Sequence, residues 1–199
     1  MYLITDLIVV FIYFVLPMLL LFSFFYWFWF KKYRSKSKSI SLIKEASKYL
    51  LVVYFVYIAY FCWFSYGIPS ESLKYNLIPF HTIWSYIKEI QIGMIRGVAL
   101  WNLLGNILLS VPFGLLVKLI FRKATFKKVF FSSVIFSIVI EFGQFVLFFT
   151  HISNRTVDID DVILNTLGGM LGYYLGNVFW SYADGIKSRI TQVQSQECK

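Results

Sequence analysis

Ionisable side chains lie in or beside two of the long apolar stretches of this sequence. Glu141 lies inside one stretch, and Asp158 and Asp161 come directly before another. A carboxylate held away from bulk water is suited to general acid–base chemistry, because burial moves its pKa toward the working range. Two neighbouring carboxylates could hold a divalent cation that binds a phosphate, and Arg155 could neutralise developing negative charge. The candidate catalytic set is therefore Glu141, Asp158, Asp161 and Arg155.

Amide side chains share helical faces with one another and with these groups. Asn102 and Asn106 are four residues apart and Glu141 and Gln144 are three apart, so each pair lies on one face of a helix. We expect the amides to orient a substrate, and the alternative is that they only hydrogen-bond between helices. The candidate substrate-binding residues are Asn102, Asn106, Gln144 and Asn165.

The segment around position 160 has a second interpretation. Asp158, Asp160 and Asp161 lie at or before the start of a predicted helix, where carboxylates cap free N–H groups. Capping of one helix needs only one such carboxylate, so it does not explain why three occur together. Positions 158, 161, 165, 168 and 172 step by three and four residues, which forms one stripe along a helix. The stripe ends in glycines with the spacing of a close helix–helix contact, either within the chain or with a second copy.

The elements that carry these residues are predicted to be membrane helices. Of 199 residues, 59% are hydrophobic, 21% aromatic and only 15% charged, whereas soluble domains carry about a quarter charged residues. The apolar residues form runs of about twenty, the length that a helix needs to cross a bilayer. This pattern excludes a soluble enzyme and a disulfide scaffold. The net charge of +9 comes from residues between the runs, which favours membrane topology over nucleic-acid binding.

We therefore predict an all-α, multi-pass protein of the cell membrane with five transmembrane helices. The predicted spans are 7–30, 49–66, 100–121, 129–149 and 162–180. Fourteen Lys and Arg residues fall on one side of this arrangement and four on the other. The positive-inside rule places the N-terminus outside and the C-terminus in the cytoplasm.

This topology also divides the chain into three parts. Residues 1–48 are the first helix and a basic cytoplasmic loop, 49–180 a four-helix membrane domain with an outer loop at 67–99, and 181–199 a cytoplasmic tail. The third and fifth spans run inward and the fourth runs outward, so all their polar residues fall in the outer half of the bilayer. One polar pocket that opens outward is the simplest explanation.

Four elements, in order along the chain, resemble the motifs of VanZ-like membrane proteins. They are 76–80 (Asn-Leu-Ile-Pro-Phe), 102–106 with 111–114 (Val-Pro-Phe-Gly), 141–144 (Glu-Phe-Gly-Gln) and 154–169. The resemblance covers about 76–176 and implies a cell-envelope role in resistance to glycopeptides, above all teicoplanin and related lipid-bearing drugs, in a Gram-positive bacterium. The functional positions that it implies are Asn106, Glu141, Gln144, Arg155, Asp158, Asp161 and Asn165.

Two hypotheses of function follow from the pocket and the resemblance. The first is that the pocket binds or modifies an outer-leaflet amphiphile: a lipid-linked cell-wall precursor, the lipid anchor of an anionic polymer, or the lipid tail of the drug. The second is a non-catalytic membrane protein that alters cell-surface display or binds a protein partner, with a polar cluster that only assembles the fold. The sequence leaves open whether a reaction occurs, whether a metal is bound, and the oligomeric state.

Overall fold

The computed structural model describes residues 16, 20, 23–24, 26–27, 31, 42–63, 75–92, 96–149 and 157–197. The helices are α3 (Leu42–Trp63), α4 (His81–Ile92), α5 (Arg96–Ile120), α6 (Phe126–Phe149) and α7 (Ile159–Glu197). Two short strands, β1 (Tyr75–Asn76) and β2 (Val157–Asp158), complete the described elements. The described part of the chain is therefore mostly helical, as predicted. Most of the predicted first span lies outside the described residues.

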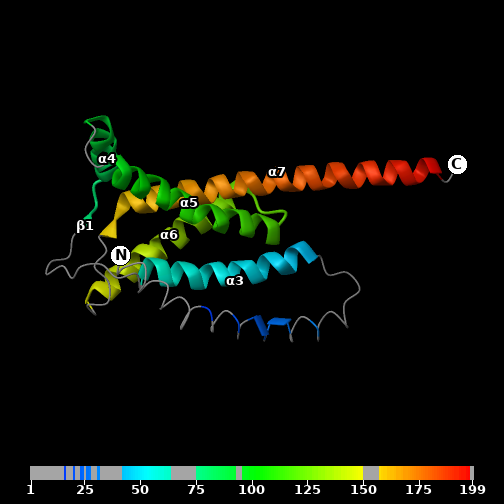
Figure 1. The fold of residues 1–199 in the computed structure, drawn as a ribbon, viewed down its shortest axis with the longest axis horizontal. Helices are drawn as coiled ribbons and strands as arrows, with labels where there is room; N and C mark the ends of the chain where they lie inside the picture. Colours follow the sequence, from blue (N-terminus) through cyan, green and yellow to red (C-terminus); the bar gives the residue numbers. More distant parts are fainter. Residues whose placement is uncertain are drawn as a thin grey trace.

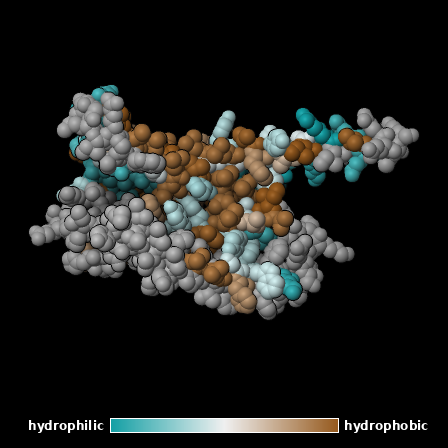
Figure 2. Space-filling model, in the orientation of Figure 1, coloured by the Kyte–Doolittle hydropathy of each residue, from teal (hydrophilic) through white to brown (hydrophobic). Residues whose placement is uncertain are grey.

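Three helices are long and apolar enough to cross a membrane: Leu42–Trp63, Asn102–Ile120 and Phe126–Phe149. They correspond to the predicted spans 49–66, 100–121 and 129–149, although α3 begins earlier than the pattern indicated. The predicted fifth span lies within α7, where glycines and asparagines reduce the mean hydropathy. Figure 2 shows apolar side chains over the middle of the bundle, with polar groups toward its two ends. The five-span count and the sides of the termini stay predictions.

The core of the bundle lies where α3, α5 and α6 meet. The rings of Phe113 and Phe136 stack with centroids 4.3 Å apart, and Tyr54 and Ile58 of α3 belong to the same buried cluster. The Tyr54 hydroxyl donates to the carbonyl of Leu109 at 2.9 Å. This bond joins α3 to α5 one turn before Pro112, and α5 continues through that proline as one helix.

Helices α5 and α7 run side by side for much of their shared length (Figure 1). A Cβ atom added to Gly172 would overlap the Val111 carbonyl oxygen and lie 2.6 Å from the Leu115 nitrogen. Equivalent atoms on Gly168 and Gly176 would also collide with α5. The predicted glycine groove is therefore confirmed as a contact within the chain, and α5 occupies it.

Helix α7 continues well beyond the bundle (Figure 1). Its 39 residues correspond to about 58 Å at 1.5 Å per residue, roughly twice the thickness of a bilayer core. The region predicted as a tail, 181–199, is thus helical as far as Glu197. Near the point where α7 leaves the bundle, Asp184 pairs with Arg122 of the α5–α6 connection.

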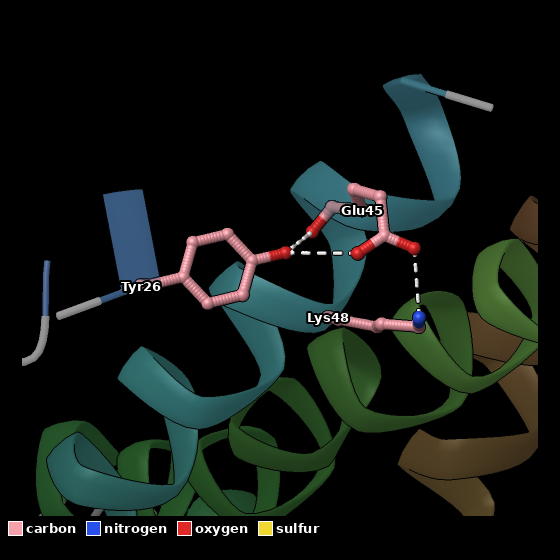
Figure 3. A network of polar contacts seen from close by, with 3 residues as sticks. All are labelled: Tyr26, Glu45 and Lys48. Carbon is pink, nitrogen blue, oxygen red and sulfur yellow. Dashed lines mark hydrogen bonds and ion pairs between the residues drawn. The ribbon is translucent and has the colours of Figure 1, made fainter. Parts of the chain in front are cut away.

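The start of α3 is fixed by a polar network around Glu45, which Figure 3 shows. The Tyr26 hydroxyl donates to the backbone carbonyl of Glu45 at 2.8 Å and to its carboxylate at 3.2 Å. Lys48 donates to the other carboxylate oxygen at 2.7 Å. The carboxylate of Glu45 therefore has protein partners on both sides, and it is buried.

At the opposite end of the bundle, the segments before α4 and α7 meet through strands β1 and β2. The two strands are parallel, with Tyr75 opposite Val157 and Asn76 opposite Asp158. The pairing brings segments about eighty positions apart in sequence into contact. It also fixes where α4 and α7 begin, which decides the geometry of the site below.

Candidate functional site

Asp160 caps the N-terminus of α4 from the first turn of α7. Its side chain is fully buried and accepts hydrogen bonds from the backbone N–H groups of Phe80 (2.5 Å), Thr82 (2.8 Å) and Ile83 (3.1 Å). The first N–H groups of a helix have no partner within the helix, so an outside acceptor stabilises them. Capping was anticipated for this segment, but the helix that Asp160 caps is a different one from its own.

Asp158 caps α7 itself and also joins α7 to α4. Its Oδ1 accepts from the backbone N–H of Asp160 at 2.9 Å and from the Asn76 amide at 3.0 Å. Its Oδ2 accepts from the Thr82 hydroxyl at 2.6 Å. The Asn76 amide donates also to Thr82 at 2.9 Å. Asp158, Asn76 and Thr82 thus form one closed triangle at the outer end of the predicted topology.

Glu141 supports this triangle from α6. The residue is 6% exposed, and its carboxylate Oε2 accepts from the backbone N–H of Asp158 at 3.0 Å. This contact fixes the position of Asp158 at the end of β2. In the same helix the Gln144 amide donates to the Cys62 carbonyl at 3.4 Å, while its Oε1 has no hydrogen-bond partner among the described residues.

The Asp158 contact gives Glu141 a testable positioning role. Gln at this position keeps an acceptor oxygen for the Asp158 N–H, whereas Ala removes it. We therefore expect Glu141→Gln to keep most of the protein's function and Glu141→Ala to lose it, with a buried donor left unpaired at a cost of about 1–3 kcal/mol. Function at matched membrane levels and thermal unfolding in detergent provide the readouts. Loss of function in a well-folded Gln variant would instead indicate acid–base chemistry.

A cavity of about 940 Å³ lies between α3, α4, α5 and the start of α7. Its walls differ in character. One wall is polar and is formed by Asn76, His81, Thr82, Tyr86, Asn102, Asn106, Asp158 and Asp161. The other is largely apolar and includes Tyr54, Tyr57, Phe61, Leu108, Leu109 and Pro112. The combination suits a molecule with a polar and an apolar part.

Hydrogen bonds order the polar wall. The Asn106 amide donates to Asp161, and the Asn102 amide donates to the Tyr86 hydroxyl at 2.9 Å. Burial raises the pKa of Tyr86 above its ordinary value; the Asn102 bond opposes the rise, and the charges of Asp161 and Asp158 add to it. The hydroxyl therefore stays protonated near neutral pH and can donate to a ligand.

The structure brings four of the predicted site residues to the cavity: Asn102, Asn106, Asp158 and Asp161. Glu141, Gln144 and Asn165 are buried and are not among its described lining residues. Asn165 accepts from the Ser110 hydroxyl at 3.0 Å, which links α7 to α5. Arg155 lies outside the described residues.

Sequence reasoning did not assign four residues of the polar wall to the site: Asn76, His81, Thr82 and Tyr86. Asn76 begins the Asn-Leu-Ile-Pro-Phe motif, which was noted as a motif but given no role. Thr82 and Tyr86 are four apart and so share a face of α4, a spacing that could have indicated them. Within the described part of the chain, no group of three or more His, Cys, Asp or Glu side chains is arranged to hold a metal ion.

Comparison with known proteins shows which family the chain resembles. The family described as VanZ/LLP1 matches residues 51–180, which carry the cavity and the bundle. The chain is similar to Protein VanZ of Enterococcus faecium, at 28% identity over 135 residues, which covers 66% of this chain and 74% of that protein. No solved structure matches the chain. On the family match, which covers well over half of its length, the chain belongs to the VanZ/LLP1 family.

Proposed function

We propose that this protein contributes to resistance to teicoplanin and other lipid-bearing glycopeptides by binding an outer-leaflet amphiphile in the cavity beside Asp161. Family membership supports the resistance role. The observation that carries the binding role is the cavity itself, whose lining is polar at α4 and at the starts of α5 and α7 and largely apolar at α3 and the following turns of α5. An amphiphile at a membrane surface has the same two parts.

The proposal includes the membrane arrangement inferred from charge, with five spans, the N-terminus outside and the cavity facing outward. Consistent with it, the start of α5, the end of α6 and the start of α7 lie at one end of the bundle (Figure 1). The basic residues Arg122, Lys123, Lys127 and Lys128 lie at the other end of α5 and α6.

The polar wall favours one class among the candidate amphiphiles. Its described members include two carboxylates, three amides and two hydroxyl groups but no Lys or Arg. Such a surface accepts hydrogen bonds from hydroxyl and amine groups, which are abundant on sugars, and repels a bare phosphate. A head group that presents sugar hydroxyls to this wall therefore fits better than one that presents a bare phosphate, whichever of the candidate lipids carries it.

The test compares Asp161→Asn with Asp184→Asn in a teicoplanin-susceptible Gram-positive host. Both changes remove one negative charge, but Asp161 lines the cavity and Asp184 pairs with Arg122 at the opposite end. We expect Asp161→Asn to weaken binding about tenfold, as for a lost hydrogen bond to a charged group. Protection against teicoplanin should fall accordingly in the Asp161→Asn variant. Protection by the Asp184→Asn variant should stay close to that of the wild type.

Vancomycin serves as the drug control because it lacks the lipid tail. Equal protection by both variants at matched membrane levels would contradict a role for the cavity. It would favour the second hypothesis, in which the polar cluster is structural and the protein alters surface display or binds a partner. Absence of protection even by the wild type would show that the resistance role does not extend to this chain.

The present contacts support binding more directly than catalysis. Glu141 is engaged with the backbone of Asp158, and the Asp158 oxygens accept bonds from Asn76, Thr82 and Asp160. Modification of the amphiphile would need a group that faces the cavity, and Asp161 and His81 both do so. The Asp161→Asn variant therefore also tests the enzymatic form of the proposal.

A further inference from the structure

We propose that a second cavity, at the other end of the bundle from Asp161, binds the phosphate head group of an anionic phospholipid. The cavity has a volume of about 780 Å³. It lies where the end of α5 and the start of α6 approach the start of α3 and Trp180 of α7. Figure 1 shows these ends of α3, α5 and α6 together on the side away from α4.

Positive charge converges on this cavity. Lys44 of α3, Arg122 and Lys123 of the α5–α6 connection, and Lys128 of α6 all line it, and its described lining contains no Asp or Glu. Arg122 is paired with Asp184. The three lysines are exposed and form no ion pair within the described residues. Glu45, the acid next to Lys44, is held by Tyr26 and Lys48 (Figure 3).

The loop that presents Arg122 and Lys123 is held in place by a buried lysine. Lys118 donates to the carbonyls of Arg122 at 2.7 Å and Ala124 at 3.1 Å. Arg122 lies over the Trp180 ring at 4.6 Å, and the Trp180 indole donates to the Lys118 carbonyl at 3.2 Å. The cationic rim is therefore supported by α5 and α7 rather than by a free loop.

The apolar wall distinguishes a lipid from a free anion. Phe113, Val117, Ile120, Phe121 and Val129 line the cavity beside the lysines. A soluble phosphate would leave this surface unused, whereas the acyl chain of a phospholipid would cover it. Lysine binds phosphate as a point charge, and basic pockets between membrane helices are suited to anionic head groups. The occupant that fits both walls is an anionic phospholipid such as phosphatidylglycerol.

The test measures lipid binding to the purified full chain in detergent by native mass spectrometry. Phosphatidylglycerol is compared with phosphatidylcholine of the same acyl chains. The site variant is Lys123→Gln with Lys128→Gln, and the matched control is Lys127→Gln with Arg189→Gln, which removes the same charge from exposed positions outside the cavity. We expect phosphatidylglycerol to be preferred and its affinity to fall about fivefold for each lysine removed. The control should bind like the wild type.

Three of the results that would overturn the proposal concern the ligands and the charge-removing variants. They are equal binding by the site and control variants, equal binding of the two lipids, and thermal stabilisation by soluble glycerol phosphate as large as that by phosphatidylglycerol, which would indicate a free-phosphate site. A Lys123→Arg, Lys128→Arg variant keeps the charge and should bind normally. A loss of phosphatidylglycerol binding in that variant would show that the lysines act through packing and not through charge, and the proposal would fail.

Discussion

Replacing Asp160 by Ala is expected to release α4 from the bundle and to abolish protection against teicoplanin. Three backbone N–H groups, those of Phe80, Thr82 and Ile83, would lose their acceptor at once. An unpaired donor costs about 1–3 kcal/mol where it is buried and less where water reaches it, and loss of a helix cap costs about 0.5–2 kcal/mol. The polar wall would then lose Thr82 and Tyr86, which α4 carries.

The backbone at Phe80 adds to this effect. Phe80 has φ of 66°, a left-handed conformation that is unfavourable for a bulky residue. Its N–H bond to Asp160 helps to hold the conformation. Without the carboxylate we expect the segment before α4 to relax to an ordinary conformation, which would move the start of the helix.

Hydrogen–deuterium exchange in detergent measures this release directly. Amides of α4 should exchange at least about tenfold faster in Asp160→Ala, since a loss of 1.4 kcal/mol corresponds to a factor of ten. Amides of α6 and of the C-terminal half of α5 should change little, because the hydrogen bond between α4 and α5 is made by Asn102, near the start of α5. Glu89→Gln is the control, as it removes a charge from α4 without touching the cap. Unchanged exchange in the α4 amides of Asp160→Ala would refute the capping role.

The sequence predicted the parts of this structure that depend on local periodicity. Three of the predicted apolar runs form α3, α5 and α6. The predicted stripe of glycines forms the surface of α7 that contacts α5. The convergence of the polar residues at one end of the bundle was also predicted, because consecutive spans were expected to run in opposite directions. Asn106 and Asp161, 55 positions apart, are in fact hydrogen-bonded.

The roles within the polar cluster could not be predicted in the same way. Asp158, Asp160 and Asp161 are nearly adjacent in sequence, yet the first joins two helices, the second caps α4 and the third lines the cavity. Their roles depend on where the segment before α4 docks, and that is set by the pairing of β1 with β2, only two residues long in each strand. Periodicity places Glu141 on a helical face but does not say which neighbour meets that face.

Substitution of Gly172 by Ala is expected to destabilise the bundle, although Ala is normally the better helix former. In an exposed helix interior this change gains up to about 1 kcal/mol. At Gly172 the new methyl group would overlap the Val111 carbonyl, and at Gly114 it would lie 2.7 Å from the Gly169 carbonyl carbon. Because both obstacles are backbone atoms, α5 and α7 must move apart. Overpacking of this kind costs about 1–3 kcal/mol.

Controls on the same two helices separate packing from propensity. A Cβ at Gly185 of α7 or Gly105 of α5 would meet nothing within 4 Å. Gly185→Ala and Gly105→Ala should therefore be neutral or slightly stabilising in thermal unfolding, whereas Gly172→Ala and Gly114→Ala lower the midpoint. The sign of the difference is the decisive result, since helix propensity predicts the same small gain at all four positions. If all four variants were equally stable, α5 and α7 could not be in the close contact that positions Asn106 against Asp161.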